Sequence, residues 1–255
     1  MVRGVSPELR KIKVIAHRGA SGYAPENSLS AIRLALSMGA DFVEIDVRRT
    51  SDGHLVVIHD SRVDRVTNGS GYVSRLRFRR LRRFSLPNGE HIPTLEEVLG
   101  LFKRDFPNSR SKLRIHVKSP GYEDGVLDAI LSSGLVDKVR IVGRRPIVRN
   151  FAAIMRQMGC SIELGLTGRF QPLGVAEELG VVEVSPEISL LTRTYVKRAH
   201  ELGIEVFTWP VNNAWTLARA RELGVDGIIT DYPDIVNLLT IEAQRFTSPS
   251  CTTIN

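Results

Sequence analysis

Short apolar runs recur along the chain and alternate with longer segments in which apolar residues return every three or four positions. The short runs are rich in Val, Ile and Leu, a composition typical of buried parallel strands. The longer segments predict amphipathic helices, and several of them are followed by a glycine that would end the helix. The predicted helices include 29–38, 192–202 and 214–223. The predicted strands are 12–16, 42–47, 55–58, 113–118, 139–142, 161–164, 181–184, 205–209 and 227–230.

Repeated alternation of strand and helix predicts a (β/α)8 TIM barrel, but the strand candidates exceed eight by one. The connection between Val47 and Leu55 explains the excess, because it holds only residues 48–54 and carries Asp52-Gly53. A parallel crossover needs about a dozen residues or more, whereas Asp-Gly favours a hairpin. We therefore expect 55–58 to return antiparallel above the barrel mouth. A chain of 255 residues suits one barrel domain, over residues 1–255.

Polar side chains with catalytic chemistry stand where the first strands end. His17 and Arg18 follow the first strand, Glu44 and Asp46 lie in the second, and His59 follows the hairpin strand. Residues two apart in a strand leave by the same face, so both carboxylates enter one space. A hard cation such as Mg²⁺ or Ca²⁺ between them would relieve their repulsion, and a buried ion pair with an arginine is the alternative. Two histidines, two carboxylates and an arginine predict metal-assisted phosphoryl transfer.

Composition adds few restrictions. Hydrophobic residues at 42% and charged residues at 25% are globular values. Because no apolar stretch approaches the roughly 20 residues of a membrane span and the N-terminus lacks a signal-peptide core, we expect a cytoplasmic protein without stable membrane insertion. Cys160 and Cys251 fit no metal spacing and imply no disulfide framework.

The formal net charge of +7 favours acidic ligands without identifying them. The densest basic block, residues 75–84, predicts a helix with an arginine-rich outer face. We favour a solvated face over a nucleic-acid or anionic-membrane patch. Aromatic residues are not spaced for base stacking, so we expect no nucleic-acid partner.

Ordered motifs spread from His17 to Asp231 give the chain a resemblance to the glycerophosphodiester phosphodiesterases, a metal-dependent barrel family related in fold to phosphoinositide-specific phospholipases C. The resemblance implies hydrolysis of a glycerophosphodiester to an alcohol and sn-glycerol 3-phosphate with one divalent cation. The matching residues are His17-Arg18-Gly19, Pro25-Glu26-Asn27, Glu44-Ile45-Asp46, Asp52-Gly53, His59-Asp60, Arg65, Thr67-Asn68-Gly69, 92–97, 209–212 and 224–231.

The resemblance also implies roles for individual residues. His17 and His59 would act as acid and base on opposite sides of the phosphorus, although a structural role for either one alone stays open. Arg18 and Lys118 would bind the nonbridging phosphate oxygens. Trp209 could pack against the alcohol part of the substrate or complete the core. Water and the glycerol 2-hydroxyl both remain candidate nucleophiles.

One position departs from the family pattern. The third barrel strand of the family usually carries Glu-x-Lys, and the matching residues here are His116-Val117-Lys118. The predicted metal ligands are therefore Glu44, Asp46 and His116. The resemblance implies Mg²⁺ or Ca²⁺, and the imidazole shifts the preference toward Mn²⁺, Co²⁺ or Zn²⁺. Two alternatives remain: Glu183 supplies a distant carboxylate, or His116 is a bystander to a metal with two protein ligands.

The segment of about 61–107 is too long for a simple loop between the second and third barrel strands. It predicts an insertion with the arginine-rich helix and a second helix near 94–103, acting as a lid or merely packing on the barrel edge. Arg144 and Arg145 could bind a second anion or flank a helix. A lysophospholipase D acting on longer lipids and a barrel that binds phosphodiesters without turnover are the alternative functions, and the sequence leaves the oligomeric state open.

Overall fold

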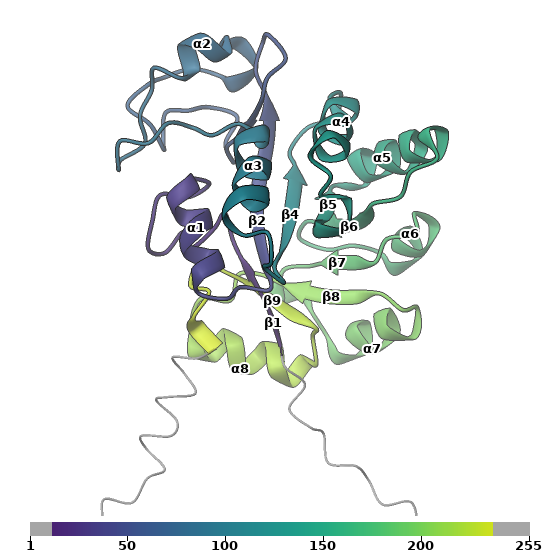
Figure 1. Ribbon diagram of the computed structural model, residues 1–255. Helices are drawn as coiled ribbons and strands as arrows, with labels where there is room; N and C mark the ends of the chain where they lie inside the picture. The colour runs from purple at the N-terminus through teal and green to yellow at the C-terminus, as the bar shows by residue number, and fades with distance from the viewer. Residues whose placement is uncertain (1–11, 237–255) are drawn as a thin grey trace, which may run out of the picture.

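The computed structural model describes residues 12–236, and eight of the strands in this range close a parallel barrel (Figure 1). The barrel order is β1-β2-β4-β5-β6-β7-β8-β9, and β9 pairs with β1 to complete the ring. The predicted (β/α)8 barrel is confirmed. Its strands are β1 (Lys13–Ala16), β2 (Phe42–Arg49), β4 (Lys112–Val117), β5 (Val139–Gly143), β6 (Glu163–Thr167), β7 (Glu183–Ser185), β8 (Glu205–Thr208) and β9 (Gly227–Thr230).

The ninth strand, β3 (Leu55–Val57), is the returning arm of a hairpin and not a barrel strand. It pairs antiparallel with β2, with Val47 opposite Val57, and Gly53 occupies the turn with φ of 94°. A positive φ is readily adopted by glycine because it lacks a Cβ atom. The Ile58 amide then donates to the Asp46 carbonyl at 2.8 Å. The expected hairpin is therefore present, and it carries the chain back over the barrel mouth.

Helices cover the outside of the barrel, and their ends follow local sequence signals. Helix α8 spans Ala214–Leu223 as predicted, because the Asn213 side chain accepts from the Thr216 amide and Gly224 adopts the left-handed conformation that ends a helix. The other helices of the barrel wall are α1 (Leu29–Ser37), α3 (Leu95–Asp105), α4 (Glu123–Ser133), α5 (Arg145–Met158), α6 (Leu173–Glu178) and α7 (Arg193–Glu201).

Two strands begin later than their apolar runs suggest. Strand β6 begins at Glu163 and β7 at Glu183, each two residues after the predicted start. Ile162 and Val181 are buried although they precede the first hydrogen-bonded residues of their strands. The apolar run therefore marks the start of burial, which precedes the start of the strand.

The segment between β3 and α3 has a small core of its own. Its apolar residues pack on β3 in a cluster separate from the main core: Val56, Ile58, Val63, Val73, Leu76, Leu81, Leu86 and Ile92. Helix α3 instead packs its apolar face into the main core. Of the predicted insertion 61–107, only the part before α3 thus lies outside the barrel wall, and it projects at the top of Figure 1 with α2.

The arginine-rich block is not one continuous helix. A 3-10 turn, η1 (Val73–Arg75), and the four-residue helix α2 (Phe78–Leu81) are separated by extended backbone at Leu76 and Arg77. Leu76 is drawn into the small core and its arginine neighbours stay exposed. Tertiary packing has overridden the helical pattern, and the arginines form a solvated surface as expected.

Buried charged side chains share the barrel interior with the rings of Phe42 and Phe207, on which Arg140 stacks. Glu183 is fully buried, and Arg114 and Arg140 donate to its two carboxylate oxygens at 2.7 to 2.9 Å. Arg140 also bonds Glu163 and Glu205 on the next strands. Because both oxygens of Glu183 are already bound by arginines, the idea that it serves as a distant metal carboxylate is wrong.

Part of the sequence prediction concerns residues beyond this range. Cys251, the N-terminal segment in which we sought a signal-peptide core, and the two ends of the expected 1–255 domain lie outside the described residues.

Candidate active site

A cavity of about 530 Å³ opens at the carboxyl ends of the barrel strands. This is the face at which barrel enzymes carry their active sites. The eight side chains to which the family resemblance gives a role all line this one cavity: His17, Arg18, Glu44, Asp46, His59, His116, Lys118 and Trp209.

Glu44, Asp46 and His116 form a compact group of metal-ligand atoms that all lie within 4.8 Å of one another. Parallel pairing sets Asp46 directly opposite His116 on β4, so the strand register alone brings carboxylate and imidazole together. His116 Nδ1 lies 3.4 Å from Glu44 and 3.3 Å from Asp46. The two carboxylates are almost completely buried. Such a group of oxygen and nitrogen donors is suited to a divalent cation.

Positive charge around the carboxylates keeps both of them ionised. Burial raises the pKa of Asp46, but His116, Lys118 and Arg18 outweigh it and hold the pKa well below its usual value. Burial and the Asp46 charge likewise raise the pKa of Glu44, and His116 with His17 reverses the net shift to a lowered pKa. Two buried anions are therefore available to a cation at neutral pH.

Asp46 is the more tightly positioned of the two carboxylates. Its Oδ2 accepts from Asn27 Nδ2 at 3.0 Å, while its amide donates to Asn27 Oδ1 at 3.1 Å. Arg18 Nε lies 3.3 Å and Lys118 Nζ 3.2 Å from the carboxylate. Its buried Oδ1 nevertheless has no hydrogen-bond partner among residues 12–236. The arginine ion pair considered for this position is thus present, and it leaves one oxygen of Asp46 available to a ligand.

Arg18 is held through both its guanidinium and its backbone amide. Its Nη1 donates to Glu26 at 2.9 Å, and its backbone amide donates to Glu44 at 2.9 Å. The residue has a positive φ of 58°, which is uncommon for a side chain with a Cβ atom and is frequent at functional sites. Its buried Nε makes no hydrogen bond within the described chain. This Nε instead contacts Asp46 as an ion pair at 3.3 Å.

His17 is held by Asp231, which follows β9. Its Nδ1 and Asp231 Oδ1 lie 2.7 Å apart, and Ser21 and Asn212 also donate to that carboxylate. These donors outweigh burial and lower the pKa of Asp231 to about 2. The ionised carboxylate fixes the Nδ1–H tautomer of His17, which leaves Nε2 as the ring nitrogen available for proton transfer.

His59 is held in the same manner by its neighbour. Its Nδ1 lies 2.6 Å from Asp60 Oδ1, and Arg65 Nε donates to the other oxygen of Asp60 at 2.6 Å. Hydrogen bonds from Arg65 and His59 outweigh burial and lower the pKa of Asp60 to about 2. The Arg48 Nε–H donates to the His59 carbonyl at 2.8 Å. Both histidines thus present an imidazole oriented by an ionised aspartate.

The pKa values of the two histidines are displaced in opposite directions. Burial lowers the pKa of His17, but Asp231 and Glu44 more than offset it and the net shift is upward. Burial lowers the pKa of His59, and Lys118 and Arg18 oppose its protonation further. A pair of groups with separated pKa values is suited to act as acid and base.

Trp209 closes the cavity on the side of β8. Its Nε1 donates to the Ser185 carbonyl at 2.9 Å, and its ring packs on a small apolar cluster that includes Phe207 and Ile229. The ring is half-buried and also lines the cavity. The two sequence-based interpretations, core packing and contact with substrate, are therefore compatible.

Of the two arginines after β5, only Arg144 lines the cavity. Arg145 lies 3.6 Å from Glu178 on the outer surface. The cavity wall further includes Arg48 and Arg169, which were not singled out from the sequence.

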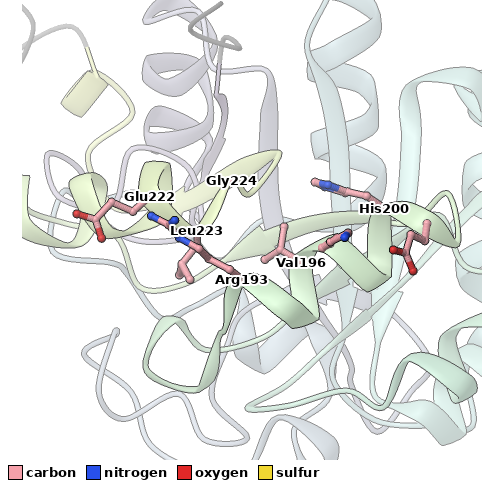
Figure 2. A pocket seen from close by; sticks show the side chains of 8 residues that line it. Arg193, Val196, His200, Glu222, Leu223 and Gly224 are labelled. Atoms are coloured by element: carbon pink, nitrogen blue, oxygen red, sulfur yellow. The ribbon is translucent and has the colours of Figure 1, made fainter. Parts of the chain in front are cut away.

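A second hollow, of about 580 Å³, lies on the outer surface between α7 and α8 (Figure 2). His200 is its only titratable imidazole, and its Nε2 bonds Asp226 at 2.7 Å. Asp226 also accepts from the Val206 amide, so the contact secures α7 to β8. None of the predicted site residues reaches this hollow. The chemistry of the chain is concentrated at the barrel mouth.

No role was assigned from the sequence to the residues that orient the site. Asp231, Asn27 and Arg65 occur in the quoted motifs, but their contacts with His17, Asp46 and Glu26 span 19 to 214 positions of sequence. A carboxylate directly after the last barrel strand was the available signal for Asp231. Arg48 had a clearer one, because it lies two residues after Asp46 on the same strand face.

Comparison with known proteins gives a consistent result. The profile of the glycerophosphoryl diester phosphodiesterase family matches residues 17–143 and 166–235. The Bacillus subtilis protein named "Putative glycerophosphodiester phosphodiesterase YhdW" is 36% identical over 236 residues, which cover 88% of this chain and 96% of the relative. A glycerophosphodiester phosphodiesterase of Caldanaerobacter subterraneus is 33% identical over 90% of this chain and 98% of its own length.

A solved structure reproduces the fold. An Oleispira antarctica phosphodiesterase, in complex with the product sn-glycerol-3-phosphate, superimposes with a TM-score of 0.75 at 22% identity, covering 89% of this chain and 96% of the other. Among residues 12–236, no helix has the length and apolar character needed to cross a membrane.

Proposed function

Because the chain belongs to the glycerophosphoryl diester phosphodiesterase family, we propose that it hydrolyses glycerophosphodiesters to an alcohol and sn-glycerol 3-phosphate with the help of one divalent cation. The observation that carries the proposal is the pairing of two aspartate-oriented histidines, His17 and His59, around one group of carboxylates in one cavity. Acid, base and anion-binding groups at a common centre are the requirements of phosphodiester hydrolysis.

Glu44, Asp46 and His116 would hold the cation. The fit is supported by the buried Asp46 Oδ1, which lacks a hydrogen-bond partner within the described chain, and by the closeness of the three donor atoms. When bound, a divalent cation neutralises charge on the phosphate and lowers the pKa of the attacking hydroxyl. Asn27 and the Arg18 amide would keep the two carboxylates in place.

His17 and His59 would move the protons. One imidazole accepts the proton of the attacking hydroxyl as the new P–O bond forms, and the other donates a proton to the alcohol oxygen as the old P–O bond breaks. Asp231 and Asp60 hold the two rings through Nδ1 and leave each Nε2 for this work. Water and the glycerol 2-hydroxyl are both nucleophiles that this arrangement supports.

Arg18 and Lys118 would stabilise the negative charge of the phosphate. Both cations lie beside Asp46 and line the cavity. Preorganised donors of this kind stabilise charge that develops in the transition state. Trp209 would provide a flat apolar wall for an uncharged part of the substrate.

His116 replaces a negative ligand with an imidazole, and we propose that the cation preference moves toward Mn²⁺, Co²⁺ or Zn²⁺. The short polar diesters are favoured over lysophospholipids because the cavity wall carries few apolar side chains, namely Val117, Trp209 and Ile229. We also propose that residues 1–255 form one catalytic domain with the segment before α3 as its insertion. The cytoplasmic location remains a prediction from the sequence.

Release of sn-glycerol 3-phosphate from glycerophosphoethanolamine, measured with a panel of divalent cations, tests the proposal. His17→Ala and His59→Ala should each lower kcat by roughly 10² to 10⁴, and His91→Ala, an exposed histidine of the insertion, should leave it unchanged. Binding of the diester without turnover in any cation would favour the binding barrel. An unchanged rate in either variant at the cavity would remove that histidine from the mechanism.

A further inference from the structure

A layer of cationic residues lies directly above the predicted metal group. Pairing of β2, β4 and β5 aligns Asp46 with His116 and His116 with Val142. Two residues further along each strand the chain carries Arg48, Lys118 and Arg144, and all of these line the cavity. Because side chains two apart leave a strand by the same face, the register places three cations side by side at the mouth.

Within the described part of the chain, two of these cations have no ion-pair partner. Lys118 lies 3.2 Å from Asp46, but neither Arg48 nor Arg144 has a carboxylate within 4.0 Å among residues 12–236. The Arg48 Nε–H donates to the His59 carbonyl at 2.8 Å, which holds the guanidinium at the cavity wall. Arg48 is half-buried and Arg144 is exposed, and both line the cavity where an anionic ligand could reach them.

The surroundings of Arg144 strengthen the positive field. Arg144 is the N-cap residue of α5, a helix of 14 residues with no acidic side chain in its first turn. The positive end of the helix dipole therefore lies at the same place. Arg169, after β6, also lines the cavity, but its charge is offset by Glu187 at 3.0 Å. Apart from Glu44 and Asp46, the cavity wall formed by the described residues carries no carboxylate.

We propose that this enzyme prefers glycerophosphodiesters whose alcohol part carries a second anionic group, such as a further phosphate, and that Arg144 is a specificity residue which binds that group. The inference rests on the proposed function, and it adds the chemical class of the alcohol. The scissile phosphate lies at the metal group and Lys118, and the second anion lies over the β4 to β6 side of the mouth. Trp209 stands at the end of β8 and serves an uncharged portion.

The same wall disfavours a cationic alcohol. A quaternary ammonium needs an aromatic cage or a carboxylate, and on the described wall Trp209 is the one aromatic ring. Choline would instead meet arginines. We therefore expect glycerophosphocholine to be a poorer substrate than a diester of equal size with a neutral alcohol.

The test compares kcat/KM for bis(glycerophospho)glycerol, which carries two phosphodiesters, with kcat/KM for glycerophosphoglycerol, whose alcohol is neutral. The parent enzyme should favour the doubly anionic substrate by about tenfold after correction for its two equivalent bonds, since a charge-assisted contact is worth about that factor. Arg144→Gln should abolish most of this preference, and the preference should weaken as salt is raised. Arg145→Gln is the matched control, because that neighbouring arginine faces Glu178 outside the cavity.

If the ratio of kcat/KM for the two substrates is the same in the parent, Arg144→Gln and Arg145→Gln, the inference is overturned. Turnover itself would still support the proposed function. If no diester is turned over, the proposed function fails, and calorimetry then decides the inference: bis(glycerophospho)glycerol should bind the parent about tenfold more tightly than it binds Arg144→Gln. Equal binding by parent and variant would overturn it.

Discussion

Arg65 donates two hydrogen bonds of 2.7 Å to Glu26, one to each carboxylate oxygen, across 39 positions of sequence. The Nε of the same guanidinium donates to Asp60 at 2.6 Å. Glu26 in turn accepts from Arg18. One insertion residue therefore links the carboxylate that orients His59 to the one that orients Arg18, and the insertion is part of the framework of the site.

Replacing the forked guanidinium of Arg65 by the single point charge of a lysine should weaken the positioning of both His59 and Arg18. We expect Arg65→Lys to lower kcat/KM roughly 10- to 100-fold, as for other residues that orient a metal site or catalytic group through a neighbour. Arg62→Lys is the control, because Arg62 pairs with Asp64 at the exposed surface. Steady-state kinetics at a saturating cation concentration measures the effect. Full activity of Arg65→Lys would show that the link does not position the catalytic groups.

The contact between His17 and Asp231 gives a prediction about pH. Asp231→Asn removes the negative charge that raises the pKa of His17 and no longer enforces the Nδ1–H tautomer. We expect kcat to fall roughly 10² to 10⁴-fold and the limb of the pH profile that reports His17 to move to lower pH. Asp234→Asn serves for comparison, since Asp234 accepts from the exposed Tyr23 hydroxyl. A pH profile that does not move would contradict the assigned contact.

Metal preference should follow the charge of residue 116. His116→Glu adds a carboxylate to Glu44 and Asp46, so we expect tighter binding of Mg²⁺ and Ca²⁺ and weaker discrimination in favour of Zn²⁺ and Co²⁺. Titration calorimetry with each ion measures affinity independently of turnover. His91→Glu makes the same change of charge on the insertion surface. If both variants bind every ion as the parent does, His116 is not a ligand.

The buried ion pairs of the barrel predict a change in stability at acid pH. In the folded protein Arg114 and Arg140 overcome burial and hold the pKa of Glu183 at about 2, against a usual value of 4.5. A depressed carboxyl pKa contributes stability that is present above pH 4.5 and is lost as pH falls toward 2. A difference of this size corresponds to about 3 kcal/mol.

Urea unfolding of the parent and Glu183→Gln at pH 7, 4 and 3 tests this expectation. At pH 7 the variant should be less stable by about 3 to 5 kcal/mol, because both arginines lose their buried partner. The difference between the two proteins should shrink as the pH falls. A constant difference would mean that Glu183 does not titrate in this range.

Short-range patterns predicted the barrel, the hairpin and the shared strand face of Glu44 and Asp46. The roles proposed for Arg18, His116, Lys118 and Trp209 came instead from the resemblance to the family. Helix α8 was bounded by Asn213 and Gly224, and the hairpin by Asp52-Gly53. Period-two geometry on one strand then placed Glu44 and Asp46 together. These signals need no knowledge of distant residues.

Contacts between distant segments left no comparable signal. The bidentate bond of Arg65 to Glu26 depends on how the insertion folds over the barrel. The sequence motifs indicated only that an insertion is present. The helix predicted over the arginine-rich block was wrong because Leu76 is bound into a core formed with β3. Glu183 appeared available until Arg114 and Arg140 were located inside the barrel.

The β2–β3 hairpin places a large part of the site on one continuous stretch of chain, residues 42–60. Two proposed metal ligands, Arg48, one imidazole and the aspartate that orients it are all carried on this single uninterrupted stretch of chain. Their relative spacing is set by local pairing, with the Ile58 amide bound to the Asp46 carbonyl. Changes elsewhere in the barrel wall can therefore reshape the opposite rim, and with it the choice of substrate, without altering the distance between the metal group and His59.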